Sequence, residues 1–341
     1  MKIAIIEASH WHVPLYLDAL EMDEAAQVVA VSDETSTRGP AIAARFAATH
    51  HDDWRQLVAE EQIDFAFVFG RHSQMYDIAV DLIERGIPFA IEKPAGLSGA
   101  QVSALSDMAL LRNHFVAVPL IFGFSSLIRE LRTAADPADW RHMSFRFIAG
   151  PISRYVDAHC NWMLEGSKAG GGCTINLAVH CIDVFQRLAG SNVRTVSARM
   201  IRDTSIADVE IYSVLTMQTD TGQLCTVETG YTYPGGTREQ REFNFSLGST
   251  GSYVQSTIGG LRTTSHAAGI VREILLDLNT DIYYAEFVRR SLRDFQEQRE
   301  PAAGLADLTA IMRIVDGAYE SDRNGGGTVD IPGSPTSDFP S

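Results

Sequence analysis

The sequence predicts an α/β protein of two domains: a doubly wound parallel sheet, followed by an α+β domain with a large, mostly antiparallel open sheet. Three observations support this prediction. The chain has 341 residues, more than one hydrophobic core ordinarily organises. Its first 120 residues alternate short apolar runs with longer amphipathic stretches. Beyond them the apolar runs become partly alternating and rich in Val, Thr, Tyr and Phe.

The first domain is predicted over residues 1–120. Its apolar runs have the length of buried parallel strands, and the stretches between them have the length of crossover helices. The predicted strands are 3–6, 28–31, 65–69, 88–91 and 115–118. The predicted helices are 13–20, 40–48 and 75–85, with Gly86 ending the last of them. Such a sheet binds ligands beyond the carboxyl ends of its strands.

The second domain is predicted over residues 121–331, and an extended tail rich in Pro and Ser is predicted over residues 332–341. Asp220-Thr221-Gly222 predicts a hairpin turn between two of its strands. The predicted strands are 144–148, 195–200, 210–216, 223–228, 242–247 and 252–255. Helices predicted to cover one face of the sheet are 128–134, 175–188, 282–299 and 305–322.

Composition and charge exclude several classes of protein. With 28 basic and 43 acidic residues the net charge is −15, which repels nucleic acid and anionic lipid, so neither is expected as a partner. The hydrophobic share of 45% is typical of a soluble globular protein, and no apolar run has the length of a signal peptide or a membrane span. Four cysteines without paired spacing indicate buried thiols, so a cytoplasmic protein is expected.

A nucleotide site in the first domain would lie at the turn after the first strand, where three glycines ordinarily allow a pyrophosphate to approach. Here Glu7, Ser9 and His12 occupy those positions. The Ser9 hydroxyl and the imidazole of His10 or His12 can donate hydrogen bonds to phosphate, and the helix start adds free N–H groups. We include Trp11, in the same turn, in the predicted cofactor-binding set.

Asp33 ends the second predicted strand, 21 residues after His12. A carboxylate at this place accepts hydrogen bonds from the adenosine ribose and disfavours a 2′-phosphate. An acidic cap on the next helix is an equally good interpretation of an Asp at a strand end. With the turn before it, Asp33 favours dinucleotide binding.

Glu92 and Lys93 close the fourth predicted strand at the carboxyl edge of the sheet. Lysine is rare in this chain, which has three lysines against 25 arginines. An ammonium at the sheet edge can donate a hydrogen bond to a substrate hydroxyl or carbonyl. The alternative, which we favour for a lone lysine, is an ion pair between Glu92 and Lys93.

A run of glycines at 170–172 opens a predicted helix that carries Asn176, His180 and Asp183. Their spacing of four and three residues places all three on one helix face. Burying such a polar stripe is costly unless the stripe is fully hydrogen-bonded or lines a cavity. The stripe is therefore a candidate substrate site.

Four motifs in this order resemble the Gfo/Idh/MocA oxidoreductase family over nearly the whole chain. They are Glu-Lys-Pro at 92–94, the glycine run with His180 and Asp183 downstream, the strand-like segment 248–252, and Ala-Tyr-Glu-Ser at 318–321. The resemblance implies a Rossmann domain that binds NAD or NADP, and a C-terminal sheet that commonly mediates oligomerisation. It further implies sugars, polyols or their derivatives as substrates, and Lys93 with His180 as the catalytic pair.

The chain departs from the family pattern at several places. At the exit of the third strand, the family usually has a Thr-Pro-Asn-like turn and a following His, where this chain has Gly70, Arg71 and His72, and then Met75. We expect the first three of these residues to join Glu92 and Lys93 in contacting the cofactor, although solvated loop residues are the alternative for Arg71 and His72.

In the predicted substrate site, Asn176 stands where the family often has an acidic residue. An amide cannot take a proton at neutral pH, so proton transfer depends more on His180 and Lys93. We predict that Tyr155 binds substrate together with Asn176 and Asp183.

The expected activity is hydride transfer between NAD, or possibly NADP, and a carbohydrate-like alcohol or carbonyl. In this hypothesis His180 exchanges the hydroxyl proton and Lys93 donates a hydrogen bond to the same oxygen. A homo-oligomer, dimer or tetramer, is expected through the C-terminal sheet. The first alternative is a non-catalytic nucleotide- or sugar-binding sensor or partner subunit. The second is an enzyme that retains NAD and hydrolyses or epimerises a glycoside by transient oxidation.

The sequence also contains residues of the kinds that bind metal ions. Five soft or borderline ligands lie within 23 residues of one another: His159, Cys160, Cys173, His180 and Cys181. Adjacent His-Cys pairs rarely chelate one ion, and small buried core residues explain the cysteines. No metal is therefore expected.

Overall fold

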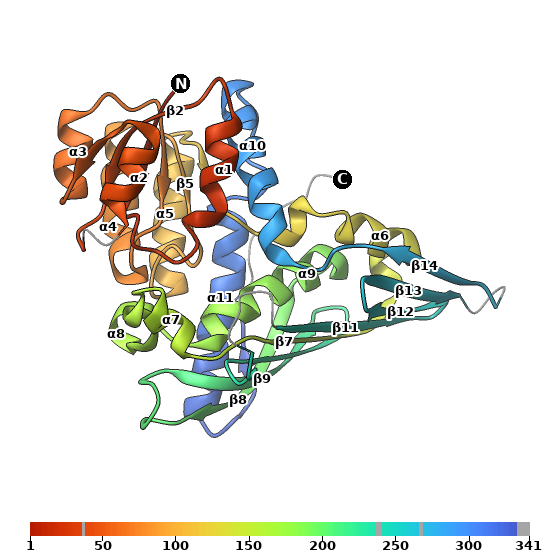
Figure 1. Cartoon of the computed structure of the whole chain (residues 1–341). Helices are drawn as coiled ribbons and strands as arrows, with labels where there is room; N and C mark the ends of the chain where they lie inside the picture. The colour runs from red at the N-terminus through yellow and green to blue at the C-terminus, as the bar shows by residue number, and fades with distance from the viewer. Residues whose placement is uncertain (36–37, 236–240, 266–268, 333–341) are drawn as a thin grey trace. The chain divides into compact units, whose positions relative to one another are not determined.

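The structure is a computed structural model that describes residues 1–35, 38–235, 241–265 and 269–332 (Figure 1). The chain forms two compact units. The first contains Met1–Ile121, Tyr155–Gly170 and Asp281–Thr309, and the second contains Phe122–Arg154, Gly171–Thr280 and Ala310–Ser341. The division into domains at residues 120 and 331 stays a prediction, and the tail predicted from residue 332 lies, except for that residue, outside the described residues.

Six parallel strands form the sheet of the first unit, in the order β3-β2-β1-β4-β5-β6. In this order β1 lies between β2 and β4, with Ile3 opposite both Val28 and Phe65. Winding reverses between β1 and β4, and the carboxyl ends there form the ligand crevice of such sheets. The strands are β1 (Lys2–Ile6), β2 (Gln27–Ser32), β3 (Thr49–His51), β4 (Phe65–Val68), β5 (Phe89–Ile91) and β6 (Val116–Ala117).

The sequence predicts only five of these strands, and β3 is the one it misses. Its residues Thr49, His50 and His51 contain no apolar run, because an edge strand of three residues needs no two-sided burial. β3 pairs with β2 alone, through Ala30, Val31 and Ser32. The helix α3 that follows it was also not predicted.

Helices connect the strands of the first unit and cover its sheet (Figure 1). The end of α4 at Gly86 is confirmed, since Gly86 has the left-handed φ of 72° and its amide donates to the Ile83 carbonyl at 3.2 Å. The helix α10 packs against α1 within the first unit, so the prediction that helix 282–299 covers the sheet of the second domain is wrong. The helices of this unit are α1 (Pro14–Met22), α2 (Gly39–Phe46), α3 (Trp54–Glu60), α4 (His72–Arg85), α5 (Gly99–Leu111), α8 (Gly166–Ala169) and α10 (Tyr283–Gln296).

Nine strands form the sheet of the second unit, in the order β14-β13-β12-β11-β7-β10-β9-β8-β15. The pair β7 and β10 is parallel and the other neighbours are antiparallel, which confirms a mostly antiparallel open sheet. The strands are β7 (Trp140–Ile148), β8 (Val193–Arg202), β9 (Glu210–Thr219), β10 (Leu224–Gly230), β11 (Glu242–Ser249), β12 (Ser252–Thr257), β13 (Gly260–Ser265), β14 (Val271–Leu275) and β15 (Val329–Asp330).

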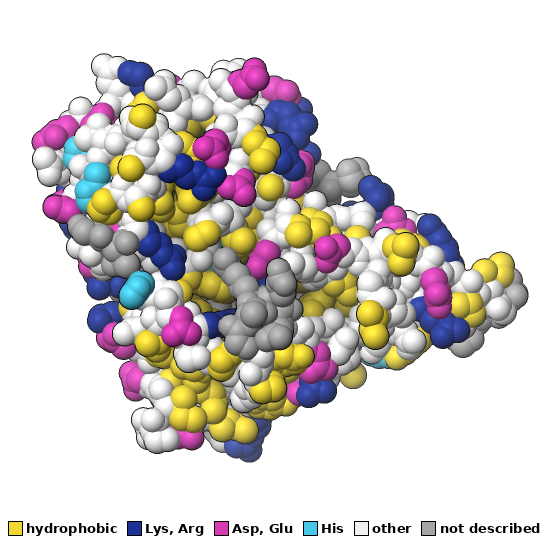
Figure 2. Space-filling model, viewed as in Figure 1, with side chains coloured by type: hydrophobic (Ala, Val, Ile, Leu, Met, Phe, Trp, Pro, Cys, Tyr) yellow, Lys and Arg dark blue, Asp and Glu magenta, His cyan; other side chains and the backbone are white. Residues whose placement is uncertain are grey.

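One face of this sheet packs against α6 (Leu127–Ala134) and α9 (Val179–Ala189). Three strands of this sheet carry exposed apolar side chains, those of Val214, Leu224 and Tyr253. The residues before and after each of them along the chain are buried. Hydrophobic side chains lie among charged ones over the molecular surface that Figure 2 shows. Two helices, α7 (Ser153–Asp157) and α11 (Leu305–Arg323), contain residues of both units.

Two further local predictions are confirmed. Gly222 has a φ of 86° in the hairpin between β9 and β10, and its amide donates to the Thr219 carbonyl at 3.0 Å. All four cysteines are free and buried, and burial raises the pKa of the Cys173, Cys181 and Cys225 thiols above their usual range. Among the described residues, no helix is both long and apolar enough to cross a bilayer.

Candidate functional site

The turn after β1 keeps the backbone shape of a glycine turn without glycine. Glu7, at the first fingerprint position, has a φ of 61°, a left-handed conformation that glycine adopts freely. Its fully buried carboxyl accepts a hydrogen bond from the Ser32 hydroxyl at 3.3 Å and one from the Glu34 amide at 3.4 Å. The Glu7 side chain is thus engaged with the end of β2.

Burial, and after it the neighbouring Asp33 carboxylate, raises the pKa of Glu7 from 4.5 to about 7. A raised pKa means that the folded state binds this proton more tightly than the unfolded chain does. The contribution to stability is full below about pH 4.5 and is lost as the pH rises through about 7.

We therefore expect Glu7→Gln to stabilise the protein at pH 8 relative to wild type, by roughly 3 kcal/mol at most, and to have little effect at pH 5. Thermal or urea unfolding at both pH values measures this difference. Glu24→Gln, at an exposed position, is the matched control. Equal stability of wild type and Glu7→Gln at pH 8 would show that folding does not raise the pKa of the Glu7 carboxyl.

His10 provides an unpaired donor in the same turn. Its Nδ1 accepts a hydrogen bond from the His12 amide at 3.1 Å, which places the ring proton on Nε2. His10 is 1% exposed, and its Nε2 has no hydrogen-bond partner among the described residues. Burial, followed by the nearby His12, lowers the pKa of His10 well below its usual range, so the ring is a neutral donor.

This arrangement fits a dinucleotide phosphate. The left-handed backbone at Glu7 sets the course of the loop, and the Glu7 carboxyl is hydrogen-bonded to the Ser32 hydroxyl of β2. The Nε2–H of His10 has no acceptor among the described residues. A buried donor without a partner costs free energy that a phosphate oxygen would recover.

Asp33 accepts hydrogen bonds from amides at the start of the following helix, whose N-cap residue is Arg38. Burial alone would raise the pKa of the Asp33 carboxyl. Hydrogen bonds from the backbone amides of Arg38 and Gly39, each 2.8 Å long, outweigh it and lower this pKa below its usual value. The amide and hydroxyl of Thr35 also donate to Asp33. Its contact with an adenosine ribose stays a prediction.

At the end of β5, Glu92 and Lys93 are both buried, with exposed fractions of 1% and 2%. Glu92 accepts a hydrogen bond of 2.6 Å from the Tyr16 hydroxyl of α1, and its carboxylate lies 3.1 Å from Nδ1 of His12. The Tyr284 hydroxyl of α10 lies 3.3 Å from the same nitrogen. Sequence reasoning missed both tyrosines, because they lie 76 or more residues from Glu92 or His12 along the chain.

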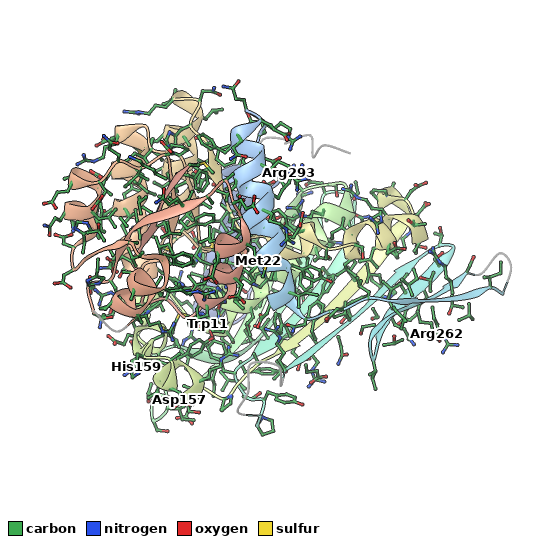
Figure 3. The ribbon with its side chains drawn as sticks, turned by 45° about the horizontal axis from the view of Figure 1, so that its top comes forward. Trp11, Met22, Asp157, His159, Arg262 and Arg293 are labelled. Atoms are coloured by element: carbon green, nitrogen blue, oxygen red, sulfur yellow. The ribbon has the colours of Figure 1, made fainter. Side chains whose placement is uncertain are left out.

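Aromatic rings surround this buried cluster. Trp11 lies in the turn between β1 and α1 (Figure 3) and meets Tyr155 edge to face, with ring centroids 5.6 Å apart. Trp162 lies 5.6 Å from the His10 ring and 4.9 Å from the His72 ring. The structure therefore places Tyr155, predicted for substrate, against the turn predicted for the cofactor.

His72 is not a solvated loop residue, which corrects one alternative. It is the first residue of α4, 1% exposed, and its Nδ1 donates to the Ala169 carbonyl at 2.7 Å. Burial lowers the pKa of His72 to about 3, so its ring is neutral. Arg71 caps the same helix and pairs with Glu34, while Gly70 lies between β4 and this cap.

Asn176, His180 and Asp183 lie in the second unit on one continuous helical segment, and each is at most 5% exposed. The segment begins with a π-helical turn, Thr174–Ala178, that the sequence did not predict, and continues as α9. The side-chain amide of Asn176 donates to the Tyr231 hydroxyl at 3.0 Å, and the Asp183 carboxylate pairs with the Arg187 guanidinium at 2.7 Å. The predicted polar stripe is therefore buried.

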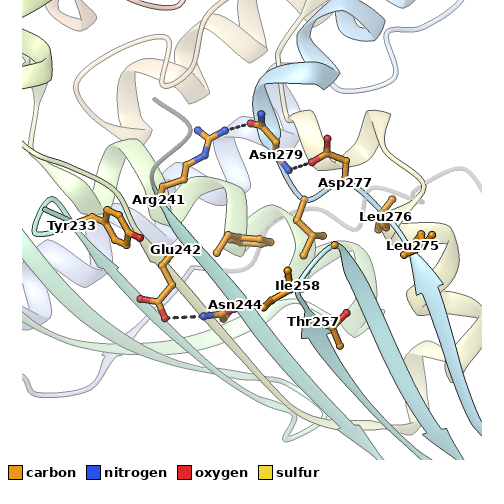
Figure 4. Close-up of a pocket in the computed structure, with 13 residues that line it drawn as sticks. Tyr233, Arg241, Glu242, Asn244, Thr257, Ile258, Leu275, Leu276, Asp277 and Asn279 are labelled. Atoms are coloured by element: carbon orange, nitrogen blue, oxygen red, sulfur yellow. Dashed lines mark hydrogen bonds between the residues drawn. The ribbon is translucent and has the colours of Figure 1, made fainter. Parts of the chain in front are cut away.

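A pocket of about 1020 Å³ opens in the second unit near the ends of β11 and β12 (Figure 4). Arg241 donates to the Asn279 side chain across it. Phe243 lines the pocket and stacks on Phe122, whose ring meets the His180 ring edge to face at 6.4 Å. Two aromatic rings thus separate the pocket from His180. Among the described residues, no group of three or more His, Cys, Asp and Glu side chains is placed to hold a metal ion.

Comparison with protein families defines the class of this protein. A model described as an oxidoreductase family with an NAD-binding Rossmann fold matches residues 1–119, and a Gfo/Idh/MocA C-terminal domain model matches residues 139–254. The two matches define an oxidoreductase whose N-terminal domain binds NAD. The chain belongs to the Gfo/Idh/MocA family.

Several solved structures share the fold. An oxidoreductase from Agrobacterium radiobacter, in complex with NAD+, L-tartaric acid and magnesium, is 18% identical with a TM-score of 0.84, covering 97% of this chain and 98% of that chain. An NAD-binding oxidoreductase from Klebsiella pneumoniae is 14% identical with a TM-score of 0.81, covering 98% and 99%. Levoglucosan dehydrogenase, in complex with NADH and levoglucosan, is 15% identical with a TM-score of 0.82, covering 98% and 100%. No curated protein sequence matches the chain significantly.

Proposed function

We propose that this protein transfers hydride between NAD and a CH–OH group of a sugar, a polyol or a related compound. The observation that carries the proposal is the burial of Lys93 at the carboxyl end of β5, in a domain of the NAD-binding family. An ammonium at this edge of the sheet can donate a hydrogen bond to a substrate hydroxyl or carbonyl. The levoglucosan complex of a structurally similar dehydrogenase supports a carbohydrate-like substrate.

In this proposal the chain's own residues handle the oxygen and its proton. As the alcohol is oxidised, His180 accepts the hydroxyl proton and Lys93 donates a hydrogen bond to the oxygen that becomes the carbonyl. Bound NAD+ supplies the acceptor for the hydride that leaves the carbon. Asn176, Asp183 and Tyr155 are proposed to orient the substrate.

The cofactor contacts are proposed to centre on the turn after β1. His10 donates through Nε2 to a phosphate oxygen, Ser9 donates through its hydroxyl, and Trp11 and His12 shape the loop. The remaining proposed contacts are Asp33, Gly70, Arg71, His72, Glu92 and Lys93.

A panel of sugars and polyols tests the activity. Purified protein is incubated with each compound and NAD+ or NADP+, and absorbance at the NADH maximum is followed. We expect turnover with at least one polyol or sugar and a preference for NAD+. Binding of NADH without turnover of any compound would favour the non-catalytic alternative.

We expect His10→Phe to weaken NADH binding by about 10- to 100-fold, because one hydrogen bond to a charged phosphate is lost. Titration of the protein with NADH, followed by fluorescence, measures the affinity without turnover. His114→Phe is the control, since His114 lies before β6 at the amino edge of the same sheet and its Nε2 donates to the Ile87 carbonyl at 2.9 Å. Equal NADH affinity of His10→Phe and wild type would remove His10 from the site.

We further propose that the solvent-facing side of the nine-stranded sheet joins copies of this chain. Exposed apolar side chains on three strands of the sheet, Val214 on β9, Leu224 on β10 and Tyr253 on β12, support an interface there. Sedimentation of wild type and Leu224→Glu would compare their masses, and a wild-type monomer at micromolar concentration would contradict the proposal.

A further inference from the structure

Glu210 is a buried carboxylate whose hydrogen bonds converge on the start of the segment that carries Asn176 and His180. It is the first residue of β9 and is 1% exposed. Its Oε2 accepts from the Gly172 amide at 2.9 Å, and its Oε1 accepts from the Thr174 amide at 2.9 Å. The first amides of a helix have no partner within the helix, so Glu210 satisfies donors that would otherwise be buried and unpaired.

Tyr319 of α11 holds this carboxylate from the other side. Its hydroxyl donates to Oε1 of Glu210 at 2.8 Å. Burial, and after it the Glu210 carboxylate, raises the pKa of Tyr319 well above its usual range, so the phenol keeps its proton and remains a donor. The helix α11 is itself fixed beside β8, where the Ala198 amide donates to the Ser321 hydroxyl at 2.9 Å (Figure 1).

Two glycines allow the chain to come this close. A Cβ on Gly171 would lie 1.9 Å from the Tyr319 hydroxyl, and a Cβ on Gly172 would lie 2.0 Å from the Glu210 carbonyl oxygen. Both distances are far below any van der Waals contact. The glycine run is therefore required by close packing against Glu210 and Tyr319, and not only by flexibility at a helix entry.

The segment depends on this anchor because its first turn is irregular. Thr174–Ala178 is π-helical. The backbone amide of Asn176 donates to the Gly172 carbonyl at 3.2 Å, which forms the first turn of the segment. Asn176 lies in this turn and His180 follows within one further turn. A change in how Gly172 and Thr174 are held is transmitted directly to both side chains.

We propose that Glu210 and Tyr319 are positioning residues that fix the orientation of Asn176 and His180. The inference rests on the proposed function, in which His180 exchanges the substrate proton. Neither residue need touch substrate, since both act through the backbone of the helical start.

The test combines a spectroscopic and a kinetic measurement on the full chain. Protein labelled with ¹³C-histidine gives signals from its ten histidines, and the His180 signal is identified by its loss in His180→Asn. In Glu210→Gln and in Tyr319→Phe, we expect the His180 signal to move by more than its line width. We also expect kcat to fall on the order of 10- to 100-fold, with NADH affinity unchanged.

Tyr212→Phe is the matched control, because it removes another phenol–carboxylate hydrogen bond of β9, the one to Glu228. It should leave both the His180 signal and kcat unchanged. Tyr319→Phe removes a single hydroxyl, so it decides the question even if Glu210→Gln does not fold. A His180 signal and a kcat in Tyr319→Phe that match wild type would overturn the inference.

Two outcomes distinguish the positioning role of Glu210 and Tyr319 from the proposed role of His180 in proton transfer. Full turnover of His180→Asn would contradict the proposed role of His180, while the histidine spectra would still show whether Glu210 and Tyr319 hold its ring. Loss of turnover in His180→Asn, with no effect of Tyr319→Phe, would leave the proposed function intact and reject the positioning role.

Discussion

Lys93→Met is expected to lower kcat by about 1000-fold, while the protein still folds and binds NADH. Methionine has a similar length and lacks the ammonium, so it fills the buried space at the end of β5 without a donor for the substrate oxygen. Steady-state turnover with the best substrate, together with NADH titration, measures both effects.

The chain offers a matched control for this substitution among its three lysines. Lys168 has a side chain that is 39% exposed and pairs with Glu165 at 2.6 Å on the surface. Lys168→Met should therefore turn over like wild type. If Lys93→Met also retained wild-type turnover, Lys93 would be a structural partner of its buried neighbours and not a catalytic group.

His180→Asn is expected to lower kcat/KM by at least about 100-fold, since it removes the group that accepts the substrate proton. Asparagine keeps a polar side chain in the buried stripe but cannot take up a proton. The pH profile provides a second readout: a general base predicts that wild-type activity falls on an acid limb, and this limb should be absent from the remaining activity of the variant.

His142→Asn is the control for His180→Asn, because His142 is an exposed histidine on β7 of the same unit. It should leave both kcat/KM and the pH profile unchanged. An acid limb that persists in His180→Asn would assign proton transfer to another group.

The sequence predicts the fold class because long apolar runs and turn glycines act locally. The buried run of β1 and the C-cap at Gly86 are both found where expected. Three of the missed strands lack such a signal: β3 is polar, and β13 and β14 have patterns in which half or more of the residues stay accessible. Their pairing depends on neighbouring strands that sequence periodicity does not report.

Individual candidate residues of the site could be predicted from the sequence where the residue type is unusual in its segment. Lys93 and His180 are unusual in their own segments, and both are buried in the structure. What surrounds them could not be predicted, because Tyr16, Glu210 and Tyr319 reach their partners from positions 36 to 109 residues away along the chain. The burial of His72 was missed for the same reason, since its partner is the Ala169 carbonyl.

The turn after β1 has no glycine, and we expect it still to bind NAD in this oxidoreductase. Calorimetric titration of the wild-type protein with NADH, and separately with NADPH, measures this binding without turnover. We expect saturable binding of about one NADH per chain, weaker binding of NADPH, and loss of affinity in His10→Phe. Absence of binding for both dinucleotides, with none copurifying in the protein's absorbance spectrum, would contradict it.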